Sequence, residues 1–264
     1  MAIRVLVHGA LGKMGREIIS GLSSDMDFTV VGAVDKNAVS NTLPLPDGKS
    51  AIPLSPDLAS VIALSRPQVM VDFSIAEATR AAAPIAAGKG TNMVIGTTGL
   101  SDKDLEEIRR LCQENRVGAV VSSNFSLGAV MMIHLSKIAA RYFDYAEIIE
   151  MHHEQKADAP SGTSISTAQA MLKARGKPFL NAVIKKETVP GTRGGQIEGI
   201  ALHSLRMPGL MAHQEVVLGE TGETLRIRHD TITRECYLPG IKRAAKEVIQ
   251  RQGLTVGLDA LLGL

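Results

Sequence analysis

The sequence has few of the features that would direct it to nucleic acid, to a membrane or to an oxidising compartment. Aromatic residues make up 3% of its 264 residues and the formal net charge is +2, so neither stacking on nucleic-acid bases nor binding to a nucleic-acid backbone is favoured. No apolar run approaches the roughly 20 residues of a membrane span, and the N-terminus enters an apolar strand without a signal-peptide pattern. Cys112 and Cys236 are expected to be reduced thiols. We expect a cytoplasmic protein.

The composition is that of a folded globular protein. Hydrophobic residues make up 45% of the chain and charged residues 21%, which is too apolar for a disordered chain. A length of 264 residues is sufficient for one large domain or two smaller ones, each with its own core.

The N-terminal half alternates apolar strands with helices. Strands are predicted at 3–9, 28–35, 68–74, 91–99 and 118–123, and helices at 13–24, 57–64, 77–88 and 102–115. Strands this apolar, separated by helices, are typical of a parallel sheet covered on both faces. The sequence therefore predicts an α/β fold with a Rossmann-type parallel sheet.

The pattern changes after Phe125. Helices are predicted at 127–143 and 164–175, strands at 146–153, 197–207, 213–220 and 223–230, and a last helix at 240–252. This pattern favours a second, α+β domain with a mixed or antiparallel sheet. We assign residues 1–125 with 236–264 to a dinucleotide-binding domain and 126–235 to a substrate-binding and oligomerisation domain.

A glycine-rich turn follows the first predicted strand. Gly9, Gly12 and Gly15 in "GALGKMG" would let the turn run tight and bring backbone amides close to a pyrophosphate. Asp35 lies twenty residues beyond Gly15, at the tip of the next strand, where a carboxylate can accept hydrogen bonds from ribose hydroxyls. An acid there favours NAD over NADP, whereas Lys36 beside it would attract the extra phosphate of NADP. Use of either cofactor therefore stays open.

The stretch "HHEQKADAPSGT", residues 152–163, is the second candidate site. Neighbouring side chains on a strand point to opposite faces, so His152 and His153 cannot converge on one metal ion, and no metal site is predicted. An imidazole titrates near neutrality and can pass a proton, and Lys156 offers a positive charge. Gly162 and Thr163 would start a helix whose exposed amides favour an anion. The simpler alternative is a pair of solvated histidines followed by a helix cap.

The motif resembles a signature of the 4-hydroxy-tetrahydrodipicolinate reductase (dihydrodipicolinate reductase) family. "EMHHEQKADAPSGT" occurs together with "VHGALGKMG", "VDFS", "GTTG", "SSNFSLG" and "RGGQIEGIALHSLRMPG", in the expected order along nearly the whole chain. The resemblance implies NAD(P)H-dependent reduction of a cyclic, unsaturated dicarboxylate in diaminopimelate and lysine biosynthesis. It also implies a homotetramer built through the sheet of the second domain.

The resemblance implies a role for each matching position. His152 would be the general acid, Lys156 a proton donor or carboxylate partner, and His153 a substrate contact, with Gly162 and Thr163 anchoring a substrate carboxylate. The segments implied to hold NADH or NADPH comprise Gly9, Ala10, Leu11, Gly12, Lys13, Met14, Asp35, Lys36, Gly96, Thr97, Thr98, Ser122, Ser123, Asn124 and Phe125.

The chain departs from the motif in one place, and some alternatives stay open. Glu154 and Gln155 stand where basic residues can occur, which would make the rim of the site less positive. His203, Arg206 and His213 are expected to be paired polar groups or interface residues, not catalysts. The alternatives are another Rossmann dehydrogenase, similar to aspartate or homoserine dehydrogenase, or a non-catalytic NAD-sensing module.

Overall fold

The computed structural model describes all 264 residues and divides into two compact units. One unit comprises Met1–Leu127 with Arg234–Leu264, and the other comprises Gly128–Thr233. The chain therefore leaves the first unit once and returns to it for its last segment.

The first unit is built on an eight-stranded sheet in the order β13-β7-β6-β5-β1-β2-β4-β3. All neighbouring pairs are parallel except β3 with β4. The predicted α/β fold is confirmed. The strands are β1 (Ile3–His8), β2 (Phe28–Val34), β3 (Thr42–Pro44), β4 (Ala51–Ser55), β5 (Val69–Asp72), β6 (Asn92–Ile95), β7 (Gly118–Val121) and β13 (Gly253–Val256).

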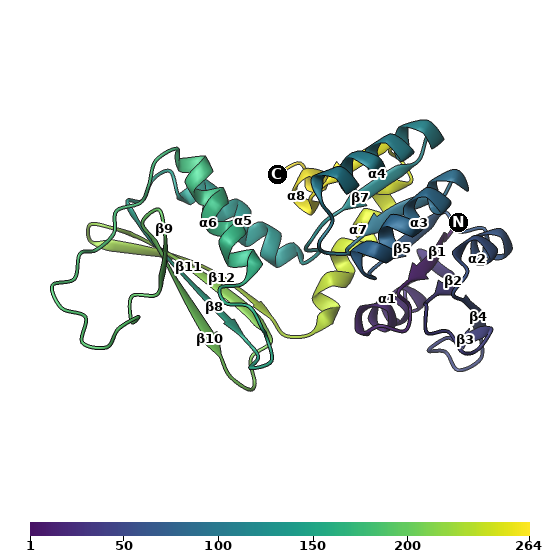
Figure 1. The fold of residues 1–264 in the computed structure, drawn as a ribbon, viewed down its shortest axis with the longest axis horizontal. Helices are drawn as coiled ribbons and strands as arrows, with labels where there is room; N and C mark the ends of the chain where they lie inside the picture. Colours follow the sequence, from purple (N-terminus) through teal and green to yellow (C-terminus); the bar gives the residue numbers. More distant parts are fainter. The chain divides into compact units, whose positions relative to one another are not determined.

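Helices cover both faces of this sheet (Figure 1). One face carries α2 (Leu58–Ser65), α3 (Ala76–Gly88) and α4 (Asp102–Asn115), and the other carries α1 (Lys13–Ser23), α7 (Leu238–Val248) and α8 (Leu258–Leu262). The central strands β1, β5, β6 and β7 are buried along nearly their whole length. This double cover explains why these strands are apolar on both sides rather than alternating.

The second unit holds a five-stranded sheet in the order β12-β11-β8-β10-β9. Its strands are β8 (Tyr145–His152), β9 (Gly195–Ile197), β10 (Ile200–Arg206), β11 (Ala212–Glu220) and β12 (Glu223–Thr231). The sheet is mixed because β10 runs parallel to β8, while the other pairs are antiparallel. The unit also contains α6 (Gly162–Arg175) and, except for its first residue, α5 (Leu127–Ala139). A short 3₁₀ turn at Arg234–Tyr237 begins the return to the first unit.

Several elements differ from the sequence prediction. The strand predicted at 197–207 is interrupted, because Glu198 (φ 44°) and Gly199 (φ 89°) adopt the left-handed conformation and separate β9 from β10. The helix predicted at 164–175 begins earlier, at Gly162, with Ser161 as its N-cap. The pattern gave no sign of the short strands β3, β4 and β13 or of α8, which have three to five residues each.

Candidate active site

The turn between β1 and α1 requires glycine at specific positions. Gly9 has φ of 78°, a conformation that L side chains rarely adopt, and a Cβ there would lie 2.9 Å from the carbonyl oxygen of Phe73. A Cβ at Gly15 would lie 2.7 Å from Cα of Ala10 and closer still to the carbonyl oxygen of Gly9. The glycines therefore let the turn fold back against the start of α1, whose first amides point out of the helix end.

Asp35 links this turn to the end of β2. Its carboxylate accepts hydrogen bonds from the amides of Leu11 at 2.9 Å and Asn37 at 2.9 Å. Because each carboxylate oxygen can accept a second bond, Asp35 retains capacity for a ligand hydroxyl. A pocket of about 310 Å³ opens beside it, and its lining includes Gly9, Leu11, Gly12, Asp35 and Lys36.

The other predicted cofactor segments follow β6 and β7, at the same edge of the parallel sheet. Thr97 is buried with its hydroxyl unpartnered, whereas Thr98 and Ser123 are exposed. Phe125 is buried and its ring lies 5.6 Å from that of Phe73, which borders the pocket. Ala10 is also buried, and Lys13 and Met14 are the first residues of α1.

Sequence reasoning missed an acid–histidine pair beneath the glycine turn. His8 Nδ1 lies 3.1 Å from Oδ1 of Asp72, a fully buried side chain on the neighbouring strand β5. Asp72 also accepts hydrogen bonds from the amide of Ser74 and the hydroxyl of Thr79. Burial would raise the pKa of Asp72, but the neighbouring imidazole of His8 and the hydrogen bonds from Ser74 and Thr79 together lower it further than burial raises it.

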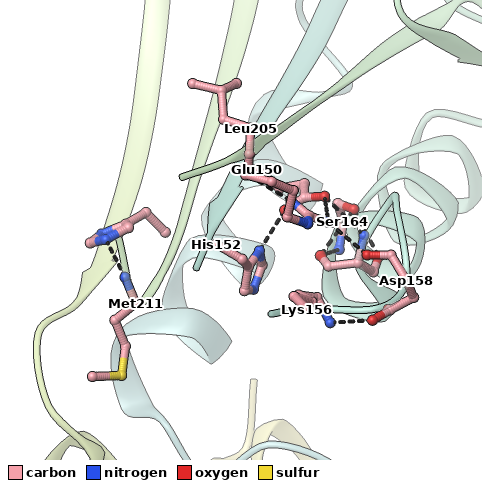
Figure 2. A network of polar contacts seen from close by, with 10 residues as sticks. Glu150, His152, Lys156, Asp158, Ser164, Leu205 and Met211 are labelled. Atoms are coloured by element: carbon pink, nitrogen blue, oxygen red, sulfur yellow. Dashed lines mark hydrogen bonds and ion pairs between the residues drawn. The ribbon is translucent and has the colours of Figure 1, made fainter. Parts of the chain in front are cut away.

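In the second unit, His152 is the last residue of β8 and is hydrogen-bonded to a carboxylate on its own strand (Figure 2). Its Nδ1 lies 2.5 Å from Oε2 of Glu150. Arg206 from β10 binds the same carboxylate through both terminal nitrogens, at 2.9 Å and 2.7 Å. A further hydrogen bond of 3.2 Å comes from the amide of Ser161.

The predicted proton donor is thus partly buried and has a defined partner. Burial lowers the pKa of His152, and the charges of Lys156 and Arg206 lower it too, while Glu150 opposes the shift. Burial alone would raise the pKa of Glu150, but hydrogen bonds led by that of Arg206 hold it below its usual value. Glu150 is therefore an anion, so the histidine donates through Nδ1 and its Nε2 is directed away from the carboxylate.

The remaining predicted substrate residues lie between His152 and the start of α6. Lys156 forms an ion pair of 2.6 Å with Asp158, while His153, Glu154 and Gln155 are exposed. Ser161 caps α6 by accepting a hydrogen bond from the amide of Ser164. Gly162 and Thr163 supply the first two residues of the helix, and no hydrogen bond within the chain engages their amides. The helix start is therefore equipped to accept an anion.

Glu150 was also missed from the sequence, although it left a signal there. It lies in the buried alternation of β8 with Ala146 and Ile148, where a charged residue needs a partner. The expected pairing of His203, Arg206 and His213 is confirmed, since each binds a carboxylate: Glu147, Glu150 and Asp230, respectively.

Two further surveys of the structure bear on the chemistry of the site. No group of three or more histidine, cysteine, aspartate or glutamate side chains is arranged to hold a metal ion. None of the helices combines the length and the apolar character that crossing a membrane requires.

Comparison with known proteins identifies the family. The family profile "Dihydrodipicolinate reductase, N-terminus" matches residues 3–125, and "Dihydrodipicolinate reductase, C-terminus" matches 128–262. A 4-hydroxy-tetrahydrodipicolinate reductase from Dehalococcoides mccartyi is 50% identical over 262 residues, covering 99% of each chain. One from Moorella thermoacetica is 49% identical, covering 98% of each.

A solved structure supports the same assignment. The dipicolinate-bound dihydrodipicolinate reductase from Paenisporosarcina sp. TG-14 superposes with a TM-score of 0.89 and 34% identity, covering 98% of this chain and 99% of that one. With both halves matched by the family profiles and relatives of about half identity over the full length, the chain belongs to the 4-hydroxy-tetrahydrodipicolinate (dihydrodipicolinate) reductase family.

Proposed function

We propose that this protein reduces 4-hydroxy-tetrahydrodipicolinate to tetrahydrodipicolinate with NADH or NADPH, as a step of diaminopimelate and lysine biosynthesis. The proposal rests on family membership together with one observation, the buried Glu150–His152 pair beside the open start of α6. Neither a dehydrogenase similar to aspartate or homoserine dehydrogenase nor a non-catalytic NAD-sensing module is favoured by the relatives.

The residues of the first unit fit a nicotinamide dinucleotide. The pocket beside Asp35 has about 310 Å³ of space, and the turn leading into it lacks side chains at Gly9 and Gly12. The amides at the start of α1 favour a pyrophosphate. When bound, the reduced cofactor supplies a hydride. We assign its binding to Gly9–Met14, Asp35, Lys36, Gly96–Thr98 and Ser122–Phe125.

His152 is assigned as the general acid. The reaction consumes one hydride and one proton and releases the 4-hydroxyl group as water. His152 can donate the proton through Nε2 because Nδ1 is already engaged by Glu150. After the transfer, the neutral ring keeps its Nδ1 proton on the same partner, so no change of tautomer is required.

The substrate carboxylates are assigned to Lys156 and to the start of α6. Lys156 is partly buried, and its partner Asp158 is exposed, so a second carboxylate can compete for the ammonium group. The amides of Gly162 and Thr163 offer two donors at the positive end of the helix. His153 is assigned as a contact at the rim. The Paenisporosarcina protein, which binds the flat dicarboxylate dipicolinate, supports a dicarboxylate at this site.

The cofactor preference is assigned to Asp35 and Lys36. Asp35 is 8% exposed and lines the pocket. Its carboxylate can accept hydrogen bonds from the ribose hydroxyls of NADH, which favours this cofactor. Lys36 is exposed at the same pocket and provides the charge that would bind the phosphate of NADPH. We therefore propose that NADH is somewhat favoured and that both cofactors are used.

We further propose a cytoplasmic homotetramer assembled through the second unit. One face of the five-stranded sheet packs on α6, through Thr167 to Gln214 for example. The opposite face displays partly exposed apolar side chains, including Ile149, Met151, Leu205 and Val217. An apolar strip of this kind on a sheet supports burial against a second copy.

The test is His152→Gln, compared with wild type and with His203→Gln, which alters the histidine paired with Glu147. Loss of a general acid is expected to lower kcat about 10²- to 10⁴-fold, while NADH binding, measured by fluorescence, stays unchanged. Turnover is followed by the loss of NADH absorbance after addition of 4-hydroxy-tetrahydrodipicolinate. Wild-type protein that binds NADH without consuming it would identify a sensing module. Full activity in His152→Gln would remove His152 from the mechanism.

A further inference from the structure

Glu150 makes contacts on three sides, in a position from which it can hold two parts of the site at once. Its side chain is 1% exposed. It is hydrogen-bonded by the imidazole of His152, by two nitrogens of Arg206, by the amide of Ser161 and by the side chain of Ser204. A carboxylate has about four acceptor positions, so Glu150 is saturated by the chain itself. It has no capacity left for substrate and does not act as a base.

The contacts of Glu150 run in two directions. His152 follows it by two residues on β8, so both side chains lie on the same face of the sheet. Ser161 is the N-cap of α6, and its amide precedes the open amides of Gly162 and Thr163. One carboxylate thus binds the imidazole and the backbone at the helix start.

Arg206 makes the burial of this charge tolerable. It lies opposite His152 in the register of β10 with β8 and binds both oxygens of Glu150. Its Nη2 also donates to the carbonyl oxygen of Asp158, 2.7 Å away, in the loop that carries Lys156. A buried carboxylate without such a partner would take up a proton instead of remaining charged.

We propose that Glu150, neutralised by Arg206, is a positioning residue that fixes both the orientation of the His152 imidazole and the start of α6, so that proton donor and carboxylate-binding turn are held as one unit. This inference rests on the proposed role of His152. It assigns to Glu150 no contact with substrate or cofactor.

A second effect of Glu150 is on the charge of His152. The charged groups that face the imidazole are Glu150 on its own strand, Arg206 on β10, and Lys156 with its partner Asp158 in the following loop. On β11 the residue opposite His152 is the uncharged Ala212. Glu150 is the group that raises the pKa of His152 against burial and the two cations. Removing its charge therefore lowers that pKa.

The experiment compares Glu150→Gln with Glu147→Gln. Glu147 lies on the same strand but on the opposite face, and it also binds one histidine and one arginine, His203 at 2.9 Å and Arg193 at 2.5 Å. The pKa of His152 is measured directly by NMR titration of its ring protons. In Glu150→Gln it is expected to fall by roughly one to three pH units, and the pH at which kcat declines on the alkaline side falls with it. In Glu147→Gln both stay unchanged.

Steady-state kinetics test the second half of the proposal. Because the helix start loses its anchor, the KM for the dicarboxylate is expected to rise about fivefold or more in Glu150→Gln, equivalent to one hydrogen bond of about 1 kcal/mol, while NADH binding is unaffected. A purely structural role would lower the amount of folded enzyme without moving the His152 titration or the KM. An unchanged titration midpoint in folded Glu150→Gln would overturn the proposal, and this readout does not depend on the reaction.

A second variant covers the case in which Glu150→Gln does not fold because Arg206 is left without its counter-charge. The double variant Glu150→Gln with Arg206→Met removes both charges. It is expected to shift the His152 titration in the same direction but less, because Arg206 itself lowers that pKa. A double variant that titrates like wild type would also reject the proposal.

Discussion

The two units each place a helix start beside an acid–histidine pair, but they hold these parts differently. In the first unit the turn before α1 follows directly on His8, which pairs with Asp72. In the second unit the start of α6 is tied to the Glu150–His152 pair through Ser161. In both units the acid is fully buried and the histidine lies at the carboxyl end of a strand.

The difference lies in what neutralises the acid. The partners of Asp72 are His8, the amide of Ser74 and the hydroxyl of Thr79, none of which is a lysine or arginine. Glu150 is bound by Arg206, which remains charged at all relevant pH values. His152 can therefore give up a proton while the Glu150 carboxylate stays paired with Arg206. We infer that the Asp72 pair serves the packing beneath the glycine turn, whereas the Glu150 pair serves chemistry.

The largest expected effect on stability comes from Asp72→Asn. The change removes a buried carboxylate that faces His8 and accepts hydrogen bonds from Ser74 and Thr79, so the free energy of unfolding is expected to fall by about 3 kcal/mol at pH 7. Because the pKa of Asp72 is lowered in the folded state, its stabilisation is present above the unfolded pKa near ~4 and is lost as pH falls through the folded value. Urea unfolding at pH 7 and pH 3 measures this.

The outcome at acid pH decides whether the charge of Asp72 is responsible for the loss of stability. Wild type and Asp72→Asn should differ clearly at pH 7 and converge as the pH is lowered toward 3. His152 should titrate as in wild type, because Asp72 is not among the groups that shift its pKa. Equal stability at pH 7 would contradict the packing role given to Asp72 and would remove the contrast with Glu150.

A smaller effect on stability is expected for Gly15→Ala. Its Cβ would collide with the backbone of Gly9 and Ala10, which cannot move aside as a side chain could. Overpacking of this kind costs about 1–3 kcal/mol, and the displaced turn should lose NADH binding, measured by fluorescence titration. Gly88→Ala, at the end of α3 where a Cβ would meet no atom within 4 Å, is the control and should leave NADH binding unchanged. Equal NADH affinity in Gly15→Ala and wild type would show that the turn does not hold the cofactor.

The sequence predicted the parts of the fold that depend on long, repeated patterns. The strands at the centre of the parallel sheet were predicted because they are continuous apolar runs, and the helices between them because their apolar residues recur at a regular spacing. Strands β3 and β13 could not be predicted, since three or four residues are too short to show a period. The break at Glu198 and Gly199 depends on a left-handed backbone that the apolar pattern of 197–207 does not encode.

The same distinction applies to the site. His152 and Lys156 were named because their side chains are chemically distinctive and close together in sequence. The residues that hold these side chains in place were missed because they lie far away in the sequence. Arg206 lies 54 residues beyond His152 in sequence but directly opposite it in the sheet. Asp72 and His8 similarly meet only because β5 pairs with β1. Such partners follow from strand order and register, which local patterns do not determine.

The smallest expected effect on stability is that of Gly162→Ala, and it tests the other half of the comparison. A Cβ at Gly162 would meet no atom within 4 Å, and its φ is not in the left-handed range. The chain itself therefore does not need glycine here, unlike at Gly15. The free energy of unfolding should stay constant or rise by less than about 1 kcal/mol, because alanine restricts the unfolded chain.

If a substrate carboxylate approaches the amides of Gly162 and Thr163, the added methyl group should raise the KM for the dicarboxylate about fivefold or more, the equivalent of one hydrogen bond. Gly88→Ala, at the end of α3 and equally open, is the matched control and should leave the KM unchanged. A Gly162→Ala enzyme with wild-type KM would mean that the substrate does not approach this helix start, and that the two units do not share a common way of holding anions.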